Sequence, residues 1–448
     1  MRIDSSTKEK LQKFVPILET FSTKWKIWVG FLVLCILFGL YALYLQIVEG
    51  HGVTGMRDNV VWGLFIVNFI FFIGTSYAGA VICSILHLLK VDWRTPIMRI
   101  GMLVTVSAAF IGPIFILLCV GRLDRLHYLF MYPRLQSPIV WDVFSISTFI
   151  IAGLLFLYLS LIKDFATYRD AEFLNVGKFR TWAYKTLSMG YKDKPEQRRQ
   201  LAISMNLMSF ILVPMVIIVS SVLSWIFGMT LRPGWHSSIF GPYFVLAAIY
   251  TGTGVIIVSL WVFRKLYKLD EYITDKHFRY LGYMMLALAS AYGYFTFSEY
   301  LTSWYGSEKW EGEVMHKLFS PDEYGYWFLY ANTVGIILPI IVMAFKSTRK
   351  TGWIAFAAFF MVSAMWVKRY LIIVPTLESA LIPIQDIRDE YVHYSATWVE
   401  WALTIGGMAS FLLFMTLAAK FVTIIPVSKM PDFKNNPIVE AEKNMATS

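Results

Sequence analysis

Ten apolar stretches alternate with polar connections along the chain, and this alternation is the strongest pattern in the sequence. They lie near residues 25–48, 60–89, 97–120, 139–162, 201–227, 240–263, 279–302, 325–345, 351–375 and 397–424. A helix needs about 17–25 predominantly apolar residues to cross a bilayer, and each stretch satisfies that length. We therefore expect an all-α integral membrane protein with ten transmembrane helices.

Composition and charge agree with this expectation. Of the 448 residues, 57% are hydrophobic and only 16% are charged, which is too apolar for a typical soluble domain. The net charge of +10 would suggest nucleic acid binding in a soluble protein, but here the positive-inside bias explains it and no nucleic acid partner is expected. With a cytoplasmic N-terminus, 30 of the 40 Lys and Arg residues fall on the cytoplasmic side. We therefore place both terminal segments, residues 1–24 and 425–448, in the cytoplasm.

A weak internal repeat indicates how the helices are grouped. Trp62–Phe65 with Gly74-Thr75 resembles Phe240–Tyr243 with Gly252-Thr253 at a constant offset of 178 residues. A parallel repeat would give two four-helix bundles, 60–227 and 240–375, with 25–48 and 397–424 as flanking helices. The alternative is that these glycines serve only close helix packing.

Cysteine and histidine usage argues against a redox centre held by this chain. Cys35, Cys83 and Cys119 lie in separate apolar stretches without a CxxC or CxxCH motif, and His87 is the single histidine inside a spanning stretch. Iron–sulfur clusters and attached haem need closely spaced cysteines, and a haem held by two histidines needs a second one at membrane depth. We expect no haem, metal or iron–sulfur cluster in this chain.

An acid enters the membrane near the start of the fourth spanning stretch. Ser137-Pro138 predicts a helix start, so Asp142 would lie one turn inside, roughly 6 Å along the axis. A carboxylate facing lipid there costs about 2.5–3.5 kcal/mol at mid-bilayer, so we expect it to face protein or a cavity. The basic residues considered as its partners are Arg99, Arg122, Arg125, His127 and Arg134.

Other ionisable residues gather at the same predicted depth, near the outer ends of several helices. Together with Asp142 they are Arg122, His236, Glu299, Lys368 and Arg369, whereas the middle and inner half offer mainly amides such as Asn68 and Asn206. Ionisable residues at membrane depth indicate a functional site. Each also has a structural alternative: a paired interfacial acid for Asp142, a helix cap for His236, snorkelling for Lys368 and Arg369, and solvation for Glu299.

This set suits a quinol, which needs donors for two ring oxygens and an acceptor for its protons. Asp142 is the candidate proton acceptor, with Arg122 or Arg369 setting its charge state. His236 could donate to a ring oxygen, and Trp141 and Trp235 could flank the ring. Asn68 and Asn206 could belong to a path of water and hydroxyl groups toward the cytoplasm.

Four segments carry a family resemblance: CVGRLDRLHYLFMYPRLQSPIVWDVFS, KDFATYRD, RPGWHSSIFGPYFVLAAIYTGTG and MWVKRYLIIVPTLES. They resemble the NrfD/PsrC superfamily of membrane subunits, most of all the quinol-binding subunit of alternative complex III and, next to it, the menaquinone reductase complex. Asp142 matches the family acid, His236 the histidine of the GWH motif, Arg122 the arginine of GR, and Arg369 the arginine after the tryptophan.

The resemblance implies a quinone- or menaquinone-binding subunit without a cofactor of its own in the bacterial inner membrane. The implied partners are a periplasmic iron–sulfur or molybdopterin-like subunit, multihaem cytochrome c subunits and a second NrfD-like membrane subunit. The sequence departs from the alternative complex III pattern at Cys119, where a histidine is expected before GR, and at Lys368, where an acid often stands. Cys119 is kept among the residues of the expected quinone site because of its position.

The sequence is therefore compatible with three functions. The first is a quinone-binding subunit of a quinol oxidoreductase complex. Such a subunit acts only together with partner subunits and is not an enzyme alone. Coupling to proton translocation is left open. The second is a secondary transporter or channel built on the repeat. The third is a passive membrane anchor whose quinone site has decayed.

Overall fold

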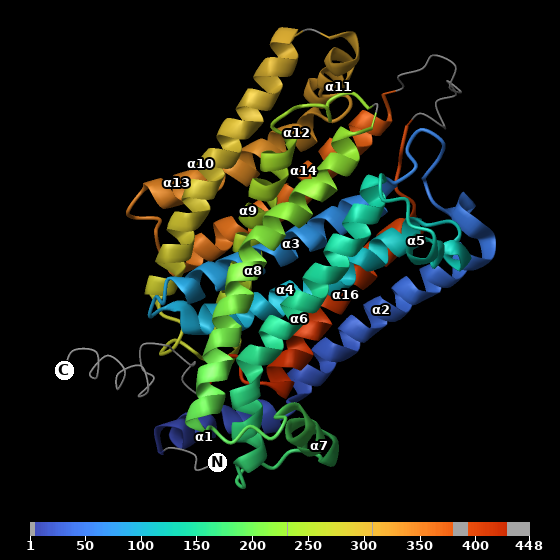
Figure 1. The fold of residues 1–448 in the computed structure, drawn as a ribbon. Helices are drawn as coiled ribbons and strands as arrows, with labels where there is room; N and C mark the ends of the chain where they lie inside the picture. The colour runs from blue at the N-terminus through green and yellow to red at the C-terminus, as the bar shows by residue number, and fades with distance from the viewer. Residues whose placement is uncertain (1–4, 231, 307, 380–392, 428–448) are drawn as a thin grey trace, which may run out of the picture.

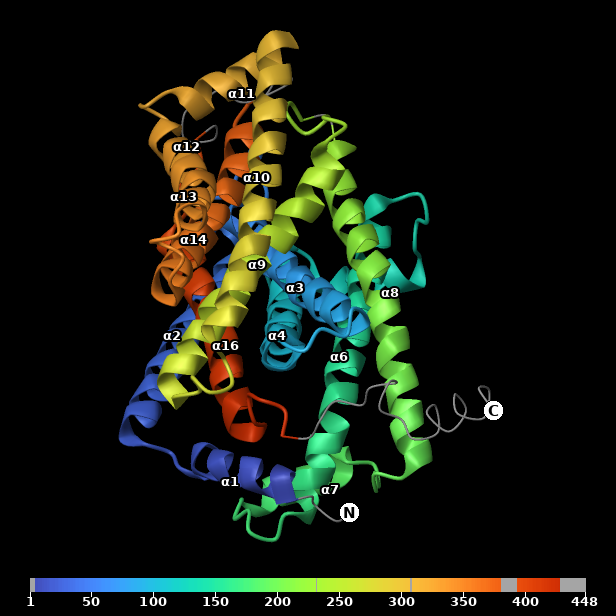
Figure 2. The ribbon, with the colours of Figure 1, turned by 90° about the vertical axis from the view of Figure 1, so that its left-hand side faces the viewer.

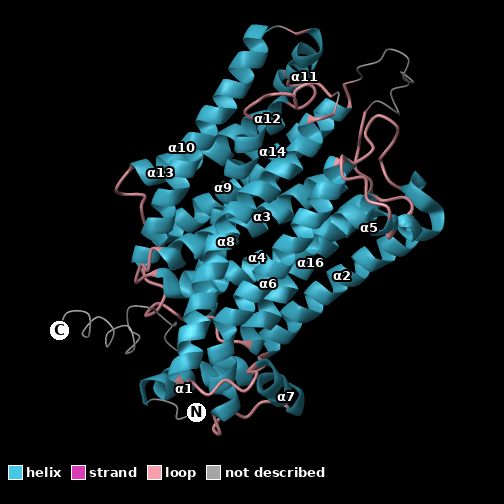
Figure 3. Ribbon diagram, in the orientation of Figure 1, coloured by secondary structure: helices cyan, strands magenta, loops and turns pink. Residues whose placement is uncertain are grey.

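The chain folds into a bundle of long, tilted helices with loops confined to its two ends (Figure 1 and Figure 3). The computed structural model describes residues 5–230, 232–306, 308–379 and 393–427, and within these ranges every regular element is a helix. The part of the expected C-terminal tail beyond residue 427 lies outside the described residues.

The long helices follow the predicted apolar stretches closely. They are α2 (Thr23–Glu49), α3 (Gly63–Leu88), α4 (Arg94–Cys119), α6 (Pro138–Asp170), α8 (Pro195–Gly228), α9 (Phe240–Tyr267), α10 (Asp275–Gly306), α14 (Thr351–Leu377) and α16 (Trp398–Phe421). A further spanning stretch consists of α12 (Gly325–Asn332), the π-helical η3 (Thr333–Ile337) and α13 (Leu338–Ala344).

Nine of these ten stretches are long and apolar enough to cross a membrane within the described part of the chain. The tenth, α10, is 32 residues long and carries many tyrosines along with charged residues near its ends. It packs against α9, α13 and α14 as a full member of the bundle. The expected all-α membrane fold is confirmed, and the chain is a multi-pass integral membrane protein.

Helix α3 occupies the centre of the bundle. Most of its residues are apolar or small on all sides, as expected for a helix surrounded by others. It contacts α4, α8, α9, α14 and α16. At its crossing with α9, a Cβ atom on Gly252 would lie 2.7 Å from the carbonyl oxygen of Thr75, and a Cβ on Gly74 would lie 3.5 Å from the Cβ of Ala248. The Gly-Thr pairs of the suspected repeat therefore lie at one close interface; the division into two bundles stays a prediction.

Helices α2 and α16, the two expected flanking helices, pack against each other. A Cβ on Gly39 would lie 3.2 Å from the carbonyl oxygen of Ala402 and from the Cα of Gly406, so two glycines allow the backbones to approach. The pair contacts the rest of the bundle mainly where α16 meets α4.

The loops define two opposite ends, which we name for nearby helices. The α1 end contains α1 (Ser5–Glu19) and α7 (Lys178–Leu187), and the α11 end contains α5 (Tyr128–Met131) and α11 (Lys309–Phe319) (Figure 1 and Figure 2). Lys420 near the last turn of α16 ties the α1 end together, because its Nζ donates to the carbonyl oxygens of Ile17 and Thr20 at 2.6 and 2.7 Å.

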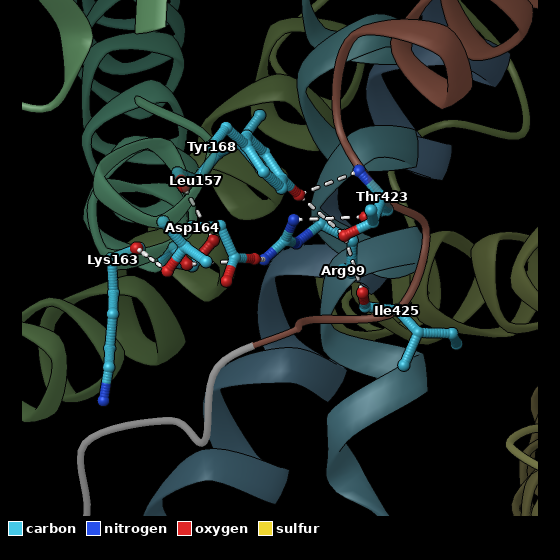
Figure 4. Close-up of polar contacts among 9 residues, drawn as sticks. Arg99, Leu157, Lys163, Asp164, Tyr168, Thr423 and Ile425 are labelled. Atoms are coloured by element: carbon cyan, nitrogen blue, oxygen red, sulfur yellow. Dashed lines mark hydrogen bonds and ion pairs between the residues drawn. The ribbon is translucent and has the colours of Figure 1, made fainter. Parts of the chain in front are cut away.

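A buried ion pair lies toward the α1 end (Figure 4). Arg99 of α4 places Nη2 2.6 Å from Oδ2 of Asp164 of α6, and its Nη1 donates to the carbonyl oxygen of Thr423 at 3.2 Å. The Tyr168 hydroxyl lies 2.7 Å from Oγ1 of Thr423. Arg99 is therefore the partner of Asp164, and not of Asp142 as considered from the sequence.

Candidate functional site

A small cavity lies inside the helix bundle, enclosed by α3, α8, α9, α10 and α14. Its volume is about 20 Å³, enough for about one ordered water molecule. Most of its wall is apolar, and the polar groups on it are Tyr77, Ser220, Tyr243, Tyr292, Lys368 and Arg369. We call it the inner cavity.

Arg369 places a guanidinium group in the wall of the inner cavity. The side chain is 4% exposed and donates from Nη1 to the carbonyl oxygen of Met365 at 2.8 Å and from Nη2 to Oγ1 of Thr251 at 3.0 Å. The Nε atom of Arg369 has no hydrogen-bond partner among the described residues. No carboxylate of the described residues forms an ion pair with Arg369 either. A buried cation without a counter-ion is costly, so its presence indicates a role beyond packing.

Lys368, the preceding residue, brings a second buried cation. Its Nζ donates to the Tyr300 hydroxyl at 2.7 Å and lies 4.7 Å from the centre of the Tyr300 ring and 5.3 Å from that of Phe328. Cation–π contacts and one hydrogen bond hold the ammonium group, and the Glu299 carboxylate lies close enough for an electrostatic interaction without forming a direct ion pair. The snorkelling considered from the sequence is not what the structure shows, because the side chain is 2% exposed and turns into the bundle.

A second cavity, of about 60 Å³, lies beside the inner one toward the α11 end. We call it the outer cavity. Trp235, Glu299, Tyr300, Glu311 and Lys368 are among its lining residues. Lys368, Tyr243 and Ile372 line both cavities, so the two are neighbours separated by these side chains.

Hydroxyl groups connect the walls of the two cavities. The Tyr243 hydroxyl donates to that of Tyr292 at 3.0 Å and lies 2.9 Å from Oγ1 of Thr296. The two tyrosine rings stack with centroids 4.9 Å apart. These hydroxyls supply both donors and acceptors at membrane depth.

Asp142 does not line either cavity but lies near the inner cavity, on α6. It is 4% exposed on α6, and its Oδ1 has no hydrogen-bond partner among the described residues. The hydroxyl of Tyr77 on α3 is also buried without such a partner and is close enough to Asp142 for an electrostatic interaction. Because Tyr77 also lines the inner cavity, it connects the acid to the wall that carries Arg369.

Helix α6 begins where the sequence predicts. Its first residue is Pro138 and Ser137 is the N-cap residue, although the serine side chain makes no capping hydrogen bond. Asp142 therefore lies one turn inside the helix and faces protein, as expected from the cost of exposing a carboxylate to lipid.

Three expected site residues lie on the surface. Arg122 pairs with Asp124 through Nε–Oδ1 and Nη2–Oδ2 contacts of 3.0 and 2.9 Å, and these hydrogen bonds lower the pKa of the Asp124 carboxyl. Trp141 is 38% exposed and donates to the carbonyl oxygen of Leu135. His236 is exposed. The structure therefore gives Arg122 a different acid as partner and brings none of the three into the two cavities.

The remaining expected residues are buried or half-buried. Trp235 stacks on Trp62 with ring centroids 6.3 Å apart, donates to the carbonyl oxygen of Ile372 at 2.9 Å and lines the outer cavity. Glu299 is half-buried beside it, and its Oε2 has no hydrogen-bond partner among the described residues. Cys119 is half-buried, with its Sγ 3.9 Å from the carbonyl oxygen of Trp62.

Asn68 and Asn206 belong to different polar groups. Asn68 of α3 donates from Nδ2 to Oγ1 of Thr404 at 2.7 Å and accepts from the indole nitrogen of Trp366 at 2.9 Å. Asn206 of α8 places Oδ1 3.0 Å from Nε2 of His87 near the α1 end. A continuous proton path through both residues stays a prediction.

Sequence reasoning missed Tyr77 and Tyr243, and it placed Lys368 among the ionisable residues at membrane depth without including it in the expected quinone site. Tyr77 stands among small residues in Gly74-Thr75-Ser76-Tyr77-Ala78-Gly79, and a lone tyrosine in such a segment of a buried helix is the signal that could have revealed it. Nothing in the sequence distinguishes the other buried tyrosines from the 25 present in the chain. In the described part of the chain, no group of three or more His, Cys, Asp or Glu residues could hold a metal ion.

Several named proteins are similar in sequence to this chain. A protein named as a membrane subunit of dimethyl sulfoxide reductase from Halobacterium salinarum is 28% identical over 54% of this chain, and the match spans about half (53%) of that relative's length. The Hdr-like menaquinol oxidoreductase integral membrane subunit of Archaeoglobus fulgidus is 21% identical over 87% of this chain and 90% of its own length. The menaquinone reductase integral membrane subunit of Nitratidesulfovibrio vulgaris is 19% identical over 90% of this chain and 93% of its own.

The family described as "Polysulphide reductase, NrfD" matches residues 52–379, a range from the loop before α3 to just past the end of α14. It includes every residue that lines the inner and outer cavities. The likeness to alternative complex III in particular stays a prediction. The chain belongs to the NrfD family of polysulphide reductase membrane subunits.

Proposed function

We propose that this chain is the quinone-binding membrane subunit of an electron-transfer complex. The observation that carries the proposal is the pair of buried cations, Lys368 and Arg369, which lie in the walls of two adjoining cavities without a carboxylate ion-pair partner among the described residues. Quinone ring oxygens need hydrogen-bond donors, and these side chains together with Tyr243 supply them. Two of the full-length relatives carry menaquinol or menaquinone in their names, which supports this ligand class.

The proposed ring site is the outer cavity and its wall toward the inner cavity. Trp235 supplies a flat apolar surface there, and Glu299 has an unpaired carboxylate oxygen for a proton. The cavities are smaller than a quinone ring, so binding requires side chains such as Tyr300 or Met315 to move. Asp142 and Tyr77 form the deeper proton-accepting group, and Asp142 keeps the acceptor role expected from the sequence.

We further propose that the α11 end faces the periplasm. The positive-inside bias supports this orientation, because most Lys and Arg residues fall at the α1 end. A periplasmic iron–sulfur or molybdopterin-like subunit would then dock beside the outer cavity. Multihaem cytochrome c subunits and a second NrfD-like membrane subunit would belong to the same complex in the bacterial inner membrane. The chain supplies the quinone site and the partners supply the redox centres.

The direct test is quinol turnover by the intact complex carrying Asp142→Asn. Positioned acid–base groups contribute about 10²–10⁴-fold, so we expect turnover to fall at least about a hundredfold, with the pH profile of the remaining activity flattened. Asp124→Asn is the matched control, because Asp124 is an exposed acid at the same end. Unaltered turnover across pH in Asp142→Asn removes the acid from the mechanism.

A second variant separates binding from proton transfer. Arg369→Gln should raise the KM for quinol more than it lowers kcat, because it removes a charged donor from the cavity wall. Co-purification without any redox-active subunit, together with uptake of a solute into liposomes, would favour a transporter instead. A complex that assembles but binds no quinone at this chain would favour the passive anchor.

A further inference from the structure

A large apolar groove runs into the bundle from the α1 end, and its inner part reaches Phe71, whose ring centre lies 6.0 Å from the Arg369 guanidinium. It is walled by α3, α9, α14 and α16, with α1 and the start of α2 closing its end and Tyr330 of α12 at its far side, and its volume is about 1190 Å³. That exceeds the about 300–1,000 Å³ typical of pockets for drug-sized ligands. We call it the α9–α16 groove.

The groove is long enough to hold the acyl chains of one lipid leaflet. Its lining residues run from Val255 to Lys268 on α9 and from Met408 to Lys420 on α16. At 1.5 Å per residue these spans are about 20 and 18 Å, which is more than half of the roughly 30 Å hydrocarbon core of a bilayer. The groove therefore accommodates acyl chains that start at the membrane surface of the α1 end, and Val367 and Tyr330 extend its wall further toward the α11 end.

The two ends of the groove differ in charge. At the membrane surface its lining includes Lys24, Lys268 and Lys420, whereas the wall toward the midplane consists of residues such as Phe71, Val258 and Phe411. No acidic side chain lies among the described residues that line it. Lys24 and Lys268 are exposed, and each is free of an ion pair with any described acid.

Further hydrogen-bonding groups surround these lysines. Thr20, Ser22 and Trp25 line the same end of the groove, and the indole nitrogen of Trp25 has no hydrogen-bond partner among the described residues. The third lysine, Lys420, donates to two backbone carbonyl oxygens and lies 5.5 Å from the centre of the Phe21 ring, so it is held in place. The end of the groove is thus positively charged, partly preformed and rich in donors.

We propose that the α9–α16 groove binds a phospholipid with an anionic headgroup from the leaflet at the α1 end. Basic pockets between transmembrane helices on the cytoplasmic side are suited to anionic lipid headgroups, and the leaflet-long apolar walls accept the acyl chains. A quinone fits less well, because its ring is uncharged and has no need of three cations. The bound lipid would fill the space between the α2–α16 pair and the rest of the bundle.

The test uses the full chain, purified in mild detergent and analysed by mass spectrometry under native conditions. Wild type should retain an anionic phospholipid in preference to a zwitterionic one. After delipidation, phosphatidylglycerol should raise the thermal unfolding midpoint, and phosphatidylcholine should not. Lys24→Gln/Lys268→Gln should weaken retention by about fivefold per lysine, since each basic residue near an anionic surface contributes on that order.

Two matched controls make the result specific. Lys26→Gln/Lys265→Gln removes the same charge from exposed positions on the same two helices that do not line the groove, and it should retain the lipid. Leu412→Trp should displace the lipid by filling the groove, whereas Leu417→Trp, exposed on the same helix outside the groove, should not. Equal retention by both lysine pairs overturns the proposal. So does recovery of a quinone in the groove, or of crosslinks from position 412 to another polypeptide in place of lipid.

Discussion

Arg99 and Asp164 form an ion pair in which neither side chain is more than 1% exposed, although the two residues come from different helices. Their 2.6 Å contact is supplemented by backbone acceptors for the guanidinium, the carbonyl oxygens of Thr423 and Ser160. The pair therefore connects α4, α6 and the segment that follows α16. A buried pair of this kind need not stabilise the fold relative to an apolar pair, but each partner depends strongly on the other.

Removing either partner alone should destabilise the protein strongly. Asp164→Leu or Arg99→Leu leaves an uncompensated buried charge, and we expect a loss of about 3–5 kcal/mol in the free energy of unfolding. The double variant should lose less than either single variant. Unfolding titrations with sodium dodecyl sulfate measure all three, and strict additivity of the two losses would contradict the interaction.

The sequence predicts the helices well and their packing poorly. The ten apolar stretches match the helices because bilayer thickness and backbone hydrogen bonding leave few alternatives. The interruption at Thr333–Ile337 was not predicted, since a π-helical segment has no simple apolar signature. Which helix lies at the centre could be guessed only from the continuous apolar and small residues of α3.

For the candidate site, too, the sequence predicts some features of single residues but not the contacts between residues of different elements. Burial of Asp142 follows from residue type and membrane depth, and that expectation agrees with the structure, whereas the sequence left open whether Arg369 turns inward. The ion pair between Arg122 and Asp124 could not be predicted from the sequence. Both residues lie in a loop, and the apolar pattern does not determine the conformation of that loop. Tyr77 interacts with Asp142 through the tertiary arrangement of α3 and α6, which no local pattern encodes.

The crossing of α3 and α9 should tolerate no side chain at Gly252. A Cβ there would lie 2.7 Å from the carbonyl oxygen of Thr75 and even closer to the Cβ of Ala78, so Gly252→Ala forces the helices apart. Overpacking of this kind costs about 1–3 kcal/mol. Gly30→Ala is the control, because a Cβ at Gly30 meets nothing within 4 Å. Equal unfolding free energies for the two variants would show that the helices approach less closely than described.

Glu378 should make stability depend on pH. Burial raises the pKa of this carboxyl at the end of α14 above its usual value of 4.5, although Tyr394 donates its backbone N–H to Oε1 at 2.7 Å and Lys317 and His393 are nearby. A raised folded-state pKa means that the fold binds the proton more tightly than the unfolded chain does. Its stabilising contribution is therefore complete below about pH 4.5 and is lost as pH rises through the folded-state value.

Comparison with Glu378→Gln isolates this contribution. Relative to that variant, the wild-type protein should lose stability as pH rises above about 4.5, as measured by unfolding midpoints in detergent. Glu308→Gln, at an exposed acid of the same end, should follow the wild-type curve. A wild-type curve parallel to that of Glu378→Gln would show that the carboxyl is not held in its protonated form.

Lys368 offers the sharpest separation of function from stability. Its ammonium group is buried against Tyr300 and Phe328 without a carboxylate ion pair in the described structure, so the fold carries a desolvation cost for it. Lys368→Met keeps a chain of similar length and removes that cost. We expect the unfolding midpoint to stay unchanged or rise, while quinol turnover by the intact complex falls at least about tenfold, because the wall between the two cavities loses a charged donor. Lys346→Met, at an exposed position of the α1 end, should change neither quantity. If Lys368→Met lowers both stability and turnover, the lysine stabilises the fold, and the quinone site consists of Arg369 and the tyrosines alone. If turnover stays unchanged, Lys368 does not contact the quinone.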